Sequence, residues 1–440
     1  MNISKLLSTR VRNIKINPFL EDLTAQKNFL HSQINDKKIL VIGGAGTIGS
    51  SYIKQILKYK PLKITVVDIN ENGLTELTRD LRSSSSLDYK PEYITYPVNL
   101  LSDTFDKVFN SDIWDVVSNF SAHKHVRSEK DKISVEALIK NNVFGAIKLL
   151  NLCEDNPPNY FFSVSTDKAA NPVNIMGASK SLMEKLILSK KDDFRVSTAR
   201  FANVAFSNGS LLDGFVYRLN KKQPLSCPDD IKRFFVTPEQ SGQICLLATF
   251  LGETGNIFFP KLDFHKDQIY FKDIALDYLK EEGLEAVYMN SEKEAKEYDI
   301  DSGSGKYPIY FFKTDTSGEK TYEEFFTEEE DYDIKKYDSL GFINTSKVQI
   351  SFNEVETDFD TVFSNLDSGK LDIVKIIKKY KSLGYINSTE TEISFGSVKN
   401  DFEVVFSNPK ASKSDIIKVI NKYVPDFSHI ETGKHLDQKM

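Results

Sequence analysis

The chain has 440 residues, 40% of them apolar, with a mean hydropathy of -0.35, which predicts a globular protein with room for two or three domains. Its net charge of -6 and pI near 5.7 argue against a nucleic-acid or anionic-membrane partner, because both are bound by a basic face. The cysteines, Cys153, Cys227 and Cys245, lack metal-binding or paired spacing, and no apolar run reaches the ~20 residues of a membrane helix. We therefore expect a soluble cytoplasmic protein without a metal site.

The first predicted elements are helical, and a regular alternation of strands and helices follows. Residues 1–36, with "LEDLTAQKNFLHSQIN", predict an amphipathic helical extension. From Lys37, "KKILVIGGAGTIGSSYIKQILK" predicts a strand, a glycine turn and a helix, and "KITVVDIN", "WDVVSNFSA" and "YFFSVST" predict further strands. This alternation predicts an α/β fold with a Rossmann-type doubly wound parallel sheet, whose ligands bind at the carboxyl ends of the strands.

The glycine turn after the first strand has the spacing of a dinucleotide-binding site. Gly43 permits a tight turn, Gly46 allows a pyrophosphate to approach the backbone, and Gly49 allows close helix packing. Asp68 ends the next strand, where a carboxylate accepts hydrogen bonds from ribose hydroxyls and repels a 2′-phosphate, which favours NAD over NADP. The alternative is that Asp68 caps the helix beginning near Glu71. The candidate cofactor residues of this segment are Gly43, Gly46, Thr47, Ile48, Gly49 and Asp68.

The stretch "FFSVSTDKAANPVNIMGASKSLMEK" carries the candidate chemistry. Asp167 and Lys168 follow an apolar strand, and Met176 and Lys180 lie four positions apart on the predicted helix. A short-chain dehydrogenase has Tyr-x-x-x-Lys at this place, because a tyrosinate beside an ammonium is a good base for a hydroxyl. An adjacent Asp and Lys are most often a solvated turn, so the surrounding motifs decide between the two interpretations.

Those motifs occur in order over residues 37 to about 330: "GGAGTIGS", "DINENGLTEL", "SAHKHV", "NNVFGA", "STDKAANPVNIMGASK", "ARFANV", "SNGSLLDGF", "KRFFVTPEQ" and "SGEKTYEE". The chain resembles the extended short-chain dehydrogenase/reductase superfamily and, within it, bacterial polysaccharide-biosynthesis nucleotide-sugar 4,6-dehydratases acting on UDP-N-acetylglucosamine or close relatives. Met-x-x-x-Lys is similar to a subgroup that is typically membrane-anchored, and we expect this chain to be a relative without the anchor. It departs from the family at Asn99, where an acidic residue usually follows the third strand.

The resemblance implies roles for the Asp-Lys pair. Asp167 would protonate the departing C6 hydroxyl of the sugar, and Lys168 would take the C5 proton, for which it must be neutral. We expect burial and the nearby Lys180 cation to lower the pKa of Lys168. With a methionine in place of tyrosine, Thr166 is the nearest hydroxyl to relay the C4 proton, to Lys168 or to water. Lys180 would bind the nicotinamide ribose.

Further candidate residues lie in the other motifs. The resemblance implies that the loop of "HKH" lies against the cofactor, with Lys124 near the substrate or the nicotinamide. Two histidines two positions apart without other ligands make a poor metal site. Small polar groups after residue 200 suit a sugar or diphosphate, and an arginine suits a phosphate. Glu319 and Lys320 could close over the nucleotide, and structural pairing of the two side chains is the alternative. The additional cofactor candidates are Ala122, Lys124 and Asn142, and the substrate candidates are Lys124, Asn203, Ser207, Ser210, Arg233 and Glu319.

The C-terminal region contains a tandem duplication. Residues 334–380 align without a gap on 377–423, with 26 of 47 positions identical. "DIVKIIKKY" in the first copy places Ile373, Val374, Ile376 and Ile377 on one helix face, so we expect a mainly helical tail whose copies pack on the core or on a neighbouring subunit. We therefore divide the chain into the extension, a core over 37–330 whose smaller substrate-binding part follows residue 200, and a duplicated region over 331–440 with a docking tail.

These patterns predict an NAD-dependent lyase that converts a UDP- or GDP-N-acetylhexosamine into the 4-keto-6-deoxy sugar for surface polysaccharide or glycan biosynthesis. We also expect a homo-oligomer. A nucleotide-sugar 4-epimerase on the same scaffold is the first alternative, because it would oxidise and re-reduce C4 without elimination. A non-catalytic NAD-binding scaffold is the second, since the tyrosine is replaced. The Asp167-Lys168 pair favours the dehydratase, because an epimerase has no use for an elimination pair.

Overall fold

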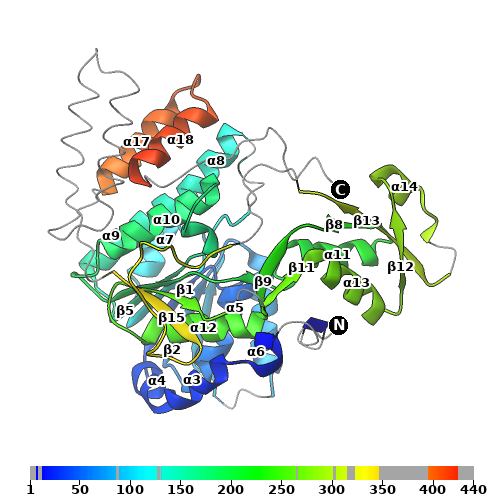
Figure 1. Cartoon of the computed structure of the whole chain (residues 1–440). Coiled ribbons are helices and arrows are strands. Elements are labelled where there is room, and N and C mark those ends of the chain that lie inside the picture. The colour runs from blue at the N-terminus through cyan, green and yellow to red at the C-terminus, as the bar shows by residue number, and fades with distance from the viewer. Residues whose placement is uncertain are drawn as a thin grey trace.

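The computed structural model describes residues 6–7, 12–85, 89–125, 129, 131–263, 266–300, 304–314, 323–345 and 395–424. Its centre is a sheet in the order β14-β15-β10-β6-β5-β4-β1-β2-β3 (Figure 1). Pairing is parallel from β3 to β10 and antiparallel for β15 with β10 and for β14 with β15. The order β3-β2-β1-β4-β5-β6 confirms the predicted Rossmann-type sheet. The strands are β1 (Lys38–Ile42), β2 (Lys63–Val67), β3 (Glu92–Tyr96), β4 (Val116–Asn119), β5 (Tyr160–Val164), β6 (Val196–Ala199), β10 (Asn256–Pro260), β14 (Tyr332–Asp333) and β15 (Leu340–Asn344).

Helices cover both faces of this sheet. In β1, Ile39 and Val41 belong to one apolar cluster while Leu40 and Ile42 belong to another, as expected when side chains alternate between the faces of a buried parallel strand. The first cluster is completed by α5 (Thr47–Ile56), α6 (Glu71–Ser83) and α12 (Pro238–Phe250), and the second by α7 (Asp103–Phe109), α8 (Lys132–Ile139), α9 (Gly145–Asp155) and α10 (Ile175–Leu188). A π-helical segment, Lys140–Phe144, joins α8 to α9.

The described part of the N-terminal region includes the short helices α2 (Arg12–Ile16), α3 (Phe19–Ala25) and α4 (Lys27–Ile34). Phe19 and Leu30 are fully buried in the first cluster. The buried carboxylate of Asp22 accepts hydrogen bonds from the backbone N–H groups of Asp338 (3.0 Å) and Ser339 (2.7 Å). The start of the chain is thereby attached to the loop that precedes β15.

A smaller lobe lies beside the main sheet (Figure 1). It consists mostly of residues after 200 and has its own apolar cluster, which includes Phe215, Tyr278 and Ile309. Its two three-stranded sheets have the orders β11-β9-β7 and β12-β13-β8. The elements are β7 (Asn203–Val204), α11 (Leu211–Asn220), β8 (Leu225–Pro228), β9 (Lys232–Val236), β11 (Gln268–Tyr270), α13 (Phe271–Glu281), β12 (Glu285–Met289), α14 (Glu292–Glu297) and β13 (Lys306–Phe312).

The duplicated region contributes to the main sheet and to the helical layer. β14 and β15 lie past residue 330, so the sheet extends into the start of the first copy. In the second copy, α17 (Phe395–Ser407) and α18 (Lys413–Tyr423) lie against α8 and α10 (Figure 1). The predicted helix face at Ile373, Val374, Ile376 and Ile377 and the predicted docking tail lie outside the described residues. Among the described helices, none is both long and apolar enough to span a bilayer.

Candidate active site

The glycine turn connects β1 to α5 with the predicted geometry. Gly43 has a φ of +74°, and a Cβ atom there would lie 2.5 Å from the backbone nitrogen of Ser121. A Cβ atom on Gly49 would lie 2.5 Å from the carbonyl oxygen of Gly43. Gly46, in contrast, has only that oxygen near its virtual Cβ, at 3.4 Å. The first and third glycines are thus required by packing, and the second leaves the backbone accessible at a helix N-terminus that no side chain caps.

Asp68 lies directly after β2, beside the glycine turn. Its Oδ2 accepts a hydrogen bond from the backbone N–H of Ala45 (3.0 Å), and its Oδ1 accepts one from the N–H of Asn70 (2.9 Å). The N-cap of α6 is Asn70, whose side chain accepts from the N–H of Gly73. Asp68 is therefore not the cap of that helix, and the alternative interpretation of this carboxylate is wrong.

The loops after β3 and β4 contain more of the predicted residues. The Asn99 side chain accepts from the N–H of Leu101 within its own loop. Asn142 is buried, accepts from the His123 N–H (2.8 Å) and donates to the His123 carbonyl and to Ser179 Oγ (both 3.0 Å). Its amide therefore holds the loop that carries Ala122 and Lys124.

The structure brings Lys124 and Ser207 together, and their assignment to one ligand stays a prediction. Lys124 Nζ donates to Ser207 Oγ at 3.4 Å, and burial lowers the pKa of Lys124 although Asp213 opposes that shift. The next residue, Asn208, donates its backbone N–H to Thr47 Oγ1 (3.1 Å). The loop at the start of the smaller lobe thus contacts the first turn of α5, next to the glycine turn.

The Asp-Lys pair lies at the carboxyl end of β5. Thr166 Oγ1 donates to Asp167 Oδ1 at 2.8 Å, and Lys168 Nζ lies 3.2 Å from the same oxygen. Asp167 is only 3% exposed. The pair is therefore an organised buried cluster rather than a solvated turn.

A residue that the sequence interpretation did not select completes this cluster. Glu323 Oε1 lies 3.3 Å from Lys168 Nζ and 3.7 Å from Arg233 Nη2. Glu323 belongs to the motif "SGEKTYEE", in which Glu319 and Lys320 were selected instead; both of those lie outside the described residues. Lys168 Nζ thus contacts one oxygen of each of two carboxylates. The prediction of a lowered pKa for Lys168 considered only burial and the Lys180 cation, and it left out these two carboxylates.

The two residues of the Met-x-x-x-Lys motif are both buried on α10. Met176 is part of the second apolar cluster. Its backbone N–H donates to the carboxylate of Glu129 (2.8 Å), a residue that the sequence did not indicate as part of the site. Lys180 Nζ donates to the Val164 carbonyl (2.8 Å), and burial lowers its pKa to about 8, although Glu184 opposes the shift. Met176 therefore fills the core, and Lys180 lies at the end of β5.

Three other substrate candidates are placed differently. Ser210 is the N-cap of α11 and accepts from the N–H of Asp213. Arg233 is 3% exposed and donates to the Lys232 carbonyl, so it contacts Glu323 rather than an open surface. Asn203 lies half-buried in β7. Ser210 therefore caps a helix and Arg233 contacts Glu323, and their assignment to the substrate stays a prediction.

Buried ion pairs hold α10 in place behind the site. Arg200, at the end of β6, forms a bidentate contact with Glu184 on α10 and a further one with Glu330 (2.9 Å). It also donates to the Phe325 carbonyl. The segment that begins with Glu323 is therefore attached to the helix that carries Lys180. No group of three or more His, Cys, Asp or Glu side chains in the described part of the chain could hold a metal ion.

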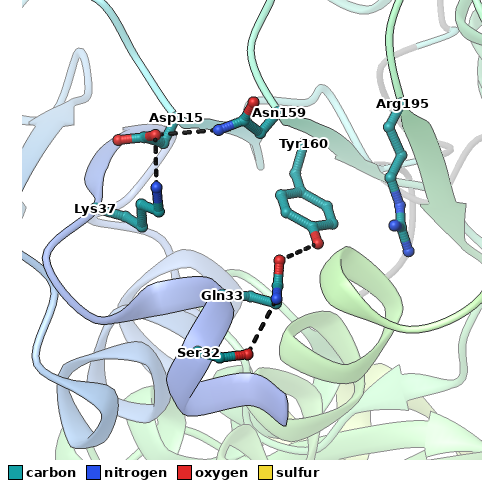
Figure 2. Close-up of a pocket in the computed structure, with 7 residues that line it drawn as sticks. All are labelled: Ser32, Gln33, Lys37, Asp115, Asn159, Tyr160 and Arg195. Carbon is teal, nitrogen blue, oxygen red and sulfur yellow. Dashed lines mark hydrogen bonds and ion pairs between the residues drawn. The ribbon is translucent and has the colours of Figure 1, made fainter.

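A polar pocket of about 340 Å³ lies at the opposite, amino-terminal edge of the sheet (Figure 2). Lys37 pairs with Asp115 (3.3 Å), and Tyr160 donates to Gln33 (2.7 Å). Arg195 donates to the carbonyls of Phe250 and Gly252. The polar side chains of the pocket thus have hydrogen-bond or ion-pair partners within the protein. We interpret the pocket as a structural contact between the sheet and α4 rather than as a reactive site. Its lining residues are Ser32, Gln33, Lys37, Asp115, Asn159, Tyr160 and Arg195.

Proteins of known sequence resemble most of this chain. The uncharacterized membrane protein MJ1061 of Methanocaldococcus jannaschii is 32% identical over 311 residues, covering 69% of this chain and 85% of that protein. A UDP-N-acetylglucosamine 4,6-dehydratase (inverting) of Campylobacter jejuni is 30% identical over 241 residues, covering 52% and 68%. A UDP-glucose 4-epimerase of Rickettsia bellii is 28% identical over 236 residues, covering 51% and 66%.

A solved structure and a family match agree with the fold. Pen from Bacillus thuringiensis has a TM-score of 0.57 and 22% identity, covering 74% of this chain and 97% of that one, which shows a shared fold. Residues 39–345, more than half of the chain, match the family described as polysaccharide biosynthesis protein. This range includes the glycine turn, the Asp-Lys pair and Glu323. The chain therefore belongs to the polysaccharide biosynthesis protein family.

Proposed function

We propose that the protein is an NAD-dependent nucleotide-sugar 4,6-dehydratase of the Met-x-x-x-Lys type, acting on a UDP- or GDP-N-acetylhexosamine. The observation that carries this proposal is the buried cluster at the end of β5, in which the Thr166 hydroxyl donates to Asp167 and Lys168 contacts Asp167 and Glu323. A 4,6-dehydration needs an acid and a base close together on one sugar face. The similarity to the C. jejuni dehydratase supports the same reaction.

The glycine turn fits the proposed cofactor. The accessible backbone at Gly46 and the uncapped start of α5 suit a pyrophosphate, and Asp68 suits the ribose hydroxyls. When bound there, NAD would accept a hydride from C4 of the sugar and return it to C6. Lys180, at the end of β5, would contribute positive charge near the nicotinamide ribose.

The side chains at β5 provide a route for each proton. As C4 loses its hydride, its hydroxyl proton passes to Thr166, whose own proton moves to Asp167 along the 2.8 Å hydrogen bond. Asp167 then donates that proton to the C6 hydroxyl, which leaves as water, while Lys168 takes the proton from C5. After the hydride has returned to C6, Lys168 gives its proton back to C5. The net change is the loss of one water, and the C4 hydroxyl becomes a ketone.

Lys168 can act as the base only after it has lost its own proton. Two carboxylates contact Lys168. Asp167 carries the proton for the C6 hydroxyl, so Glu323, with Oε1 at 3.3 Å from Lys168 Nζ, is the carboxylate that can accept the lysine proton. We assign to Glu323 the role of a positioning residue that fixes Lys168 Nζ and takes this proton. Arg233 in turn holds Glu323 through the 3.7 Å contact, so its proposed part is indirect rather than that of a phosphate ligand.

A 4-epimerase needs fewer acid-base groups than this cluster contains. Inversion at C4 requires hydride removal and return at one carbon and a single proton acceptor, and no acid has to expel a C6 hydroxyl. The similarity to the R. bellii epimerase makes this the second candidate. We also propose a cytoplasmic location, since the three cysteines are buried and unpaired, as is usual in a reducing compartment. The predicted homo-oligomer stays a prediction.

The purified protein should be incubated with NAD and either UDP- or GDP-N-acetylglucosamine, and products identified by mass spectrometry and NMR. We expect a product that has lost one water and carries a C4 ketone and a C6 methyl group. Interconversion of the C4 epimers without a change in mass would replace the dehydratase with the epimerase. Turnover of neither sugar by NAD-loaded protein would favour the scaffold.

The role of Glu323 has a separate test. Glu323→Gln keeps the shape and removes the charge that holds Lys168, and hydrogen bonds to charged groups contribute about 1.5–3 kcal/mol. We therefore expect kcat to fall roughly 10- to 100-fold and the basic limb of its pH profile to move. Glu324→Gln, on the adjacent exposed residue that accepts from Asn171, is the matched control and should change neither. An unchanged pH profile in Glu323→Gln would leave the residue a structural role only.

A further inference from the structure

The face formed by α8 and α10 is covered by the second copy of the duplicated segment. Buried side chains of α17 and α18 join the apolar cluster that contains Leu138 and Leu182. The ring of Phe402 lies 6.0 Å from that of Phe144, measured between centroids, and Lys185 Nζ donates to the Tyr423 carbonyl (3.4 Å). The buried residues of the hairpin are Val398, Phe402, Ile416, Ile420 and Tyr423, each at most 2% exposed.

Polar contacts fix the two helices to each other. Asp401 Oδ2 on α17 accepts from Lys422 Nζ (2.8 Å) and from the Tyr423 hydroxyl (2.5 Å) on α18. Asp415 forms a capping box with Ser412 at the start of α18. We call α17 with α18 the docked hairpin. Its apolar side meets α8 and α10, and residues such as Val404 face solvent.

The first copy carries the same docking residues 43 positions earlier. All five buried positions are identical, and so are the three residues of the interhelical contact. Most differences fall on exposed positions, such as Thr361 for Val404. At Ile417 and Val419, which are partly buried against the cluster, the first copy has Val374 and Ile376. The residues of the first copy that correspond to the buried positions are Val355, Phe359, Ile373, Ile377 and Tyr380, and those of the interhelical contact are Asp358, Lys379 and Tyr380.

One difference lies just past the repeat. Val424 is 1% exposed in the same cluster, and the corresponding residue of the first copy is Lys381. Placing a lysine there would bury an ammonium group or require its side chain to bend out to solvent. The sequence of the second copy thus fits the α8–α10 face better at this position.

We propose that the α8–α10 face is a docking site for either copy, so that residues 352–380 are a second occupant that competes with the docked hairpin. The described part of the chain presents one such face, and the sequence contains two segments with the same apolar residues. Burial of these residues away from water is favourable for either segment. Because Lys180 lies on α10, the segment that occupies the face also supports the helix of the candidate active site. This inference does not depend on the reaction proposed above.

Paired substitutions in the full-length chain test the proposal. Phe402→Asp with Ile420→Asp disables the second copy, and Phe359→Asp with Ile377→Asp is the matched change in the first. We expect the first-copy pair to leave the Tm unchanged and the second-copy pair to lower it by a few degrees, because the other copy takes the face. All four substitutions together should lower the Tm by more than the two pairs added. A second-copy pair as unstable as the fourfold variant would overturn the proposal.

A crosslink identifies the occupant directly and does not depend on how far the Tm moves. Phe144→Cys combined with Phe359→Cys places thiols on the face and on the first copy. In the Phe402→Asp, Ile420→Asp background, mild oxidation should give an intramolecular 144–359 disulfide by peptide mass spectrometry. With the parental second copy, the yield should fall at least several-fold. Failure to form this disulfide in a folded protein, or its formation between two chains, would overturn exchange within one chain.

Discussion

The two edges of the main sheet contain similar side chains with different surroundings. At the amino-terminal edge, Lys37 pairs with Asp115 at 3.3 Å, and both side chains are about a third exposed. At the carboxyl-terminal edge, Lys168 pairs with Asp167 at 3.2 Å, and Glu323 provides a second carboxylate. An exposed pair contributes little because water screens it, whereas a buried cluster is organised at the cost of desolvation. Polar residues alone therefore do not mark the reactive edge.

The glycine turn adds the second difference between the edges. The carboxyl-terminal edge has an accessible backbone at Gly46 and an uncapped helix start. The pocket at the amino-terminal edge has hydrogen bonds between its own lining residues, including that of Tyr160 with Gln33 (Figure 2). We therefore expect substitutions at the carboxyl-terminal edge to affect turnover and those at the other edge to affect stability alone.

The largest effect is expected from the same substitution made at both edges. Lys168→Ala removes the proposed base and should lower kcat about 10²- to 10⁴-fold, since general acid-base groups contribute that much. Lys37→Ala removes a half-exposed pair and should leave kcat unchanged, with at most ~1 kcal/mol lost in unfolding free energy. Steady-state turnover and urea unfolding check both. Equal turnover in the two variants would contradict the assignment of the reactive edge.

The second largest effect is expected in the pH dependence of stability and concerns Lys180. Unlike Lys168, it contacts a carbonyl and a thioether instead of carboxylates. Burial lowers its pKa from 10.5 to about 8, which corresponds to about 3 kcal/mol. Between pH 8 and 10.5 the unfolded chain binds the proton that the folded protein has lost, so the contribution of Lys180 to the unfolding free energy rises with pH. The stability of Lys180→Met relative to the parent should therefore fall by about 3 kcal/mol from pH 7 to 10.5.

Urea unfolding of both proteins at several pH values measures this difference. Other groups titrate in the same range, and comparison with the parent removes their contribution. Lys185→Met, on the same helix but with a side chain that is only partly buried and donates to the Tyr423 carbonyl, is the control and should give a difference that changes much less with pH. A constant difference for Lys180→Met would show that its ammonium is not destabilised by burial.

An intermediate effect is expected at Thr166. Thr166→Val keeps the shape and removes the hydroxyl that donates to Asp167, and this bond to a charged group contributes about 1.5–3 kcal/mol. Oxidation of C4 should slow roughly 10- to 100-fold, and the isotope effect from C4-deuterated substrate should increase as that step becomes rate-limiting. Thr198→Val, a buried threonine on β6, is the control. An unchanged isotope effect in Thr166→Val would assign the relay to Lys168 or water.

A smaller effect is expected in cofactor preference. Asp68→Ala removes the carboxylate that we propose to favour NAD over NADP, and we expect the ratio of their dissociation constants to shift about tenfold toward NADP. Asp115→Ala, at the other edge, should leave the ratio unchanged. Titration calorimetry with both cofactors measures it. Equal affinity for NAD and NADP in the parent would contradict the role of Asp68.

The fold and the glycine turn were predictable because local patterns determine them. The apolar runs at β1, β2, β4 and β5 and the helices between them leave few topologies other than a doubly wound sheet. Gly43 has a φ of +74°, and a Cβ atom on Gly49 would meet the Gly43 carbonyl in the same turn, so both positions require glycine for local reasons. The Asp-Lys pair was also identified, since it directly follows a strand and lies within an ordered set of motifs.

The rest of the site depends on contacts between distant segments. Glu323 reaches Lys168 from 155 positions away in the sequence, and no local pattern separates it from Glu319 in the same motif. Arg233 was assigned to a phosphate from its residue type. Its position beside Glu323 depends on tertiary contacts, which the sequence does not show. Ser210 was assigned to the substrate although serine before a helix is also a common N-cap, which is its position here.

The smallest effect is expected at Met176, the residue that replaces the usual tyrosine. Its side chain is buried in the second apolar cluster, so Met176→Leu is close to volume-conserving and should cost under roughly 1.5 kcal/mol while keeping most activity. Met183→Leu makes the same change seven positions further along α10, where the sulfur accepts from Lys180 Nζ (3.5 Å). That variant should disturb Lys180 and lower activity more. If Met176→Leu were inactive and Met183→Leu active, the thioether at 176 would have a role in placing the sugar that burial in the core does not provide.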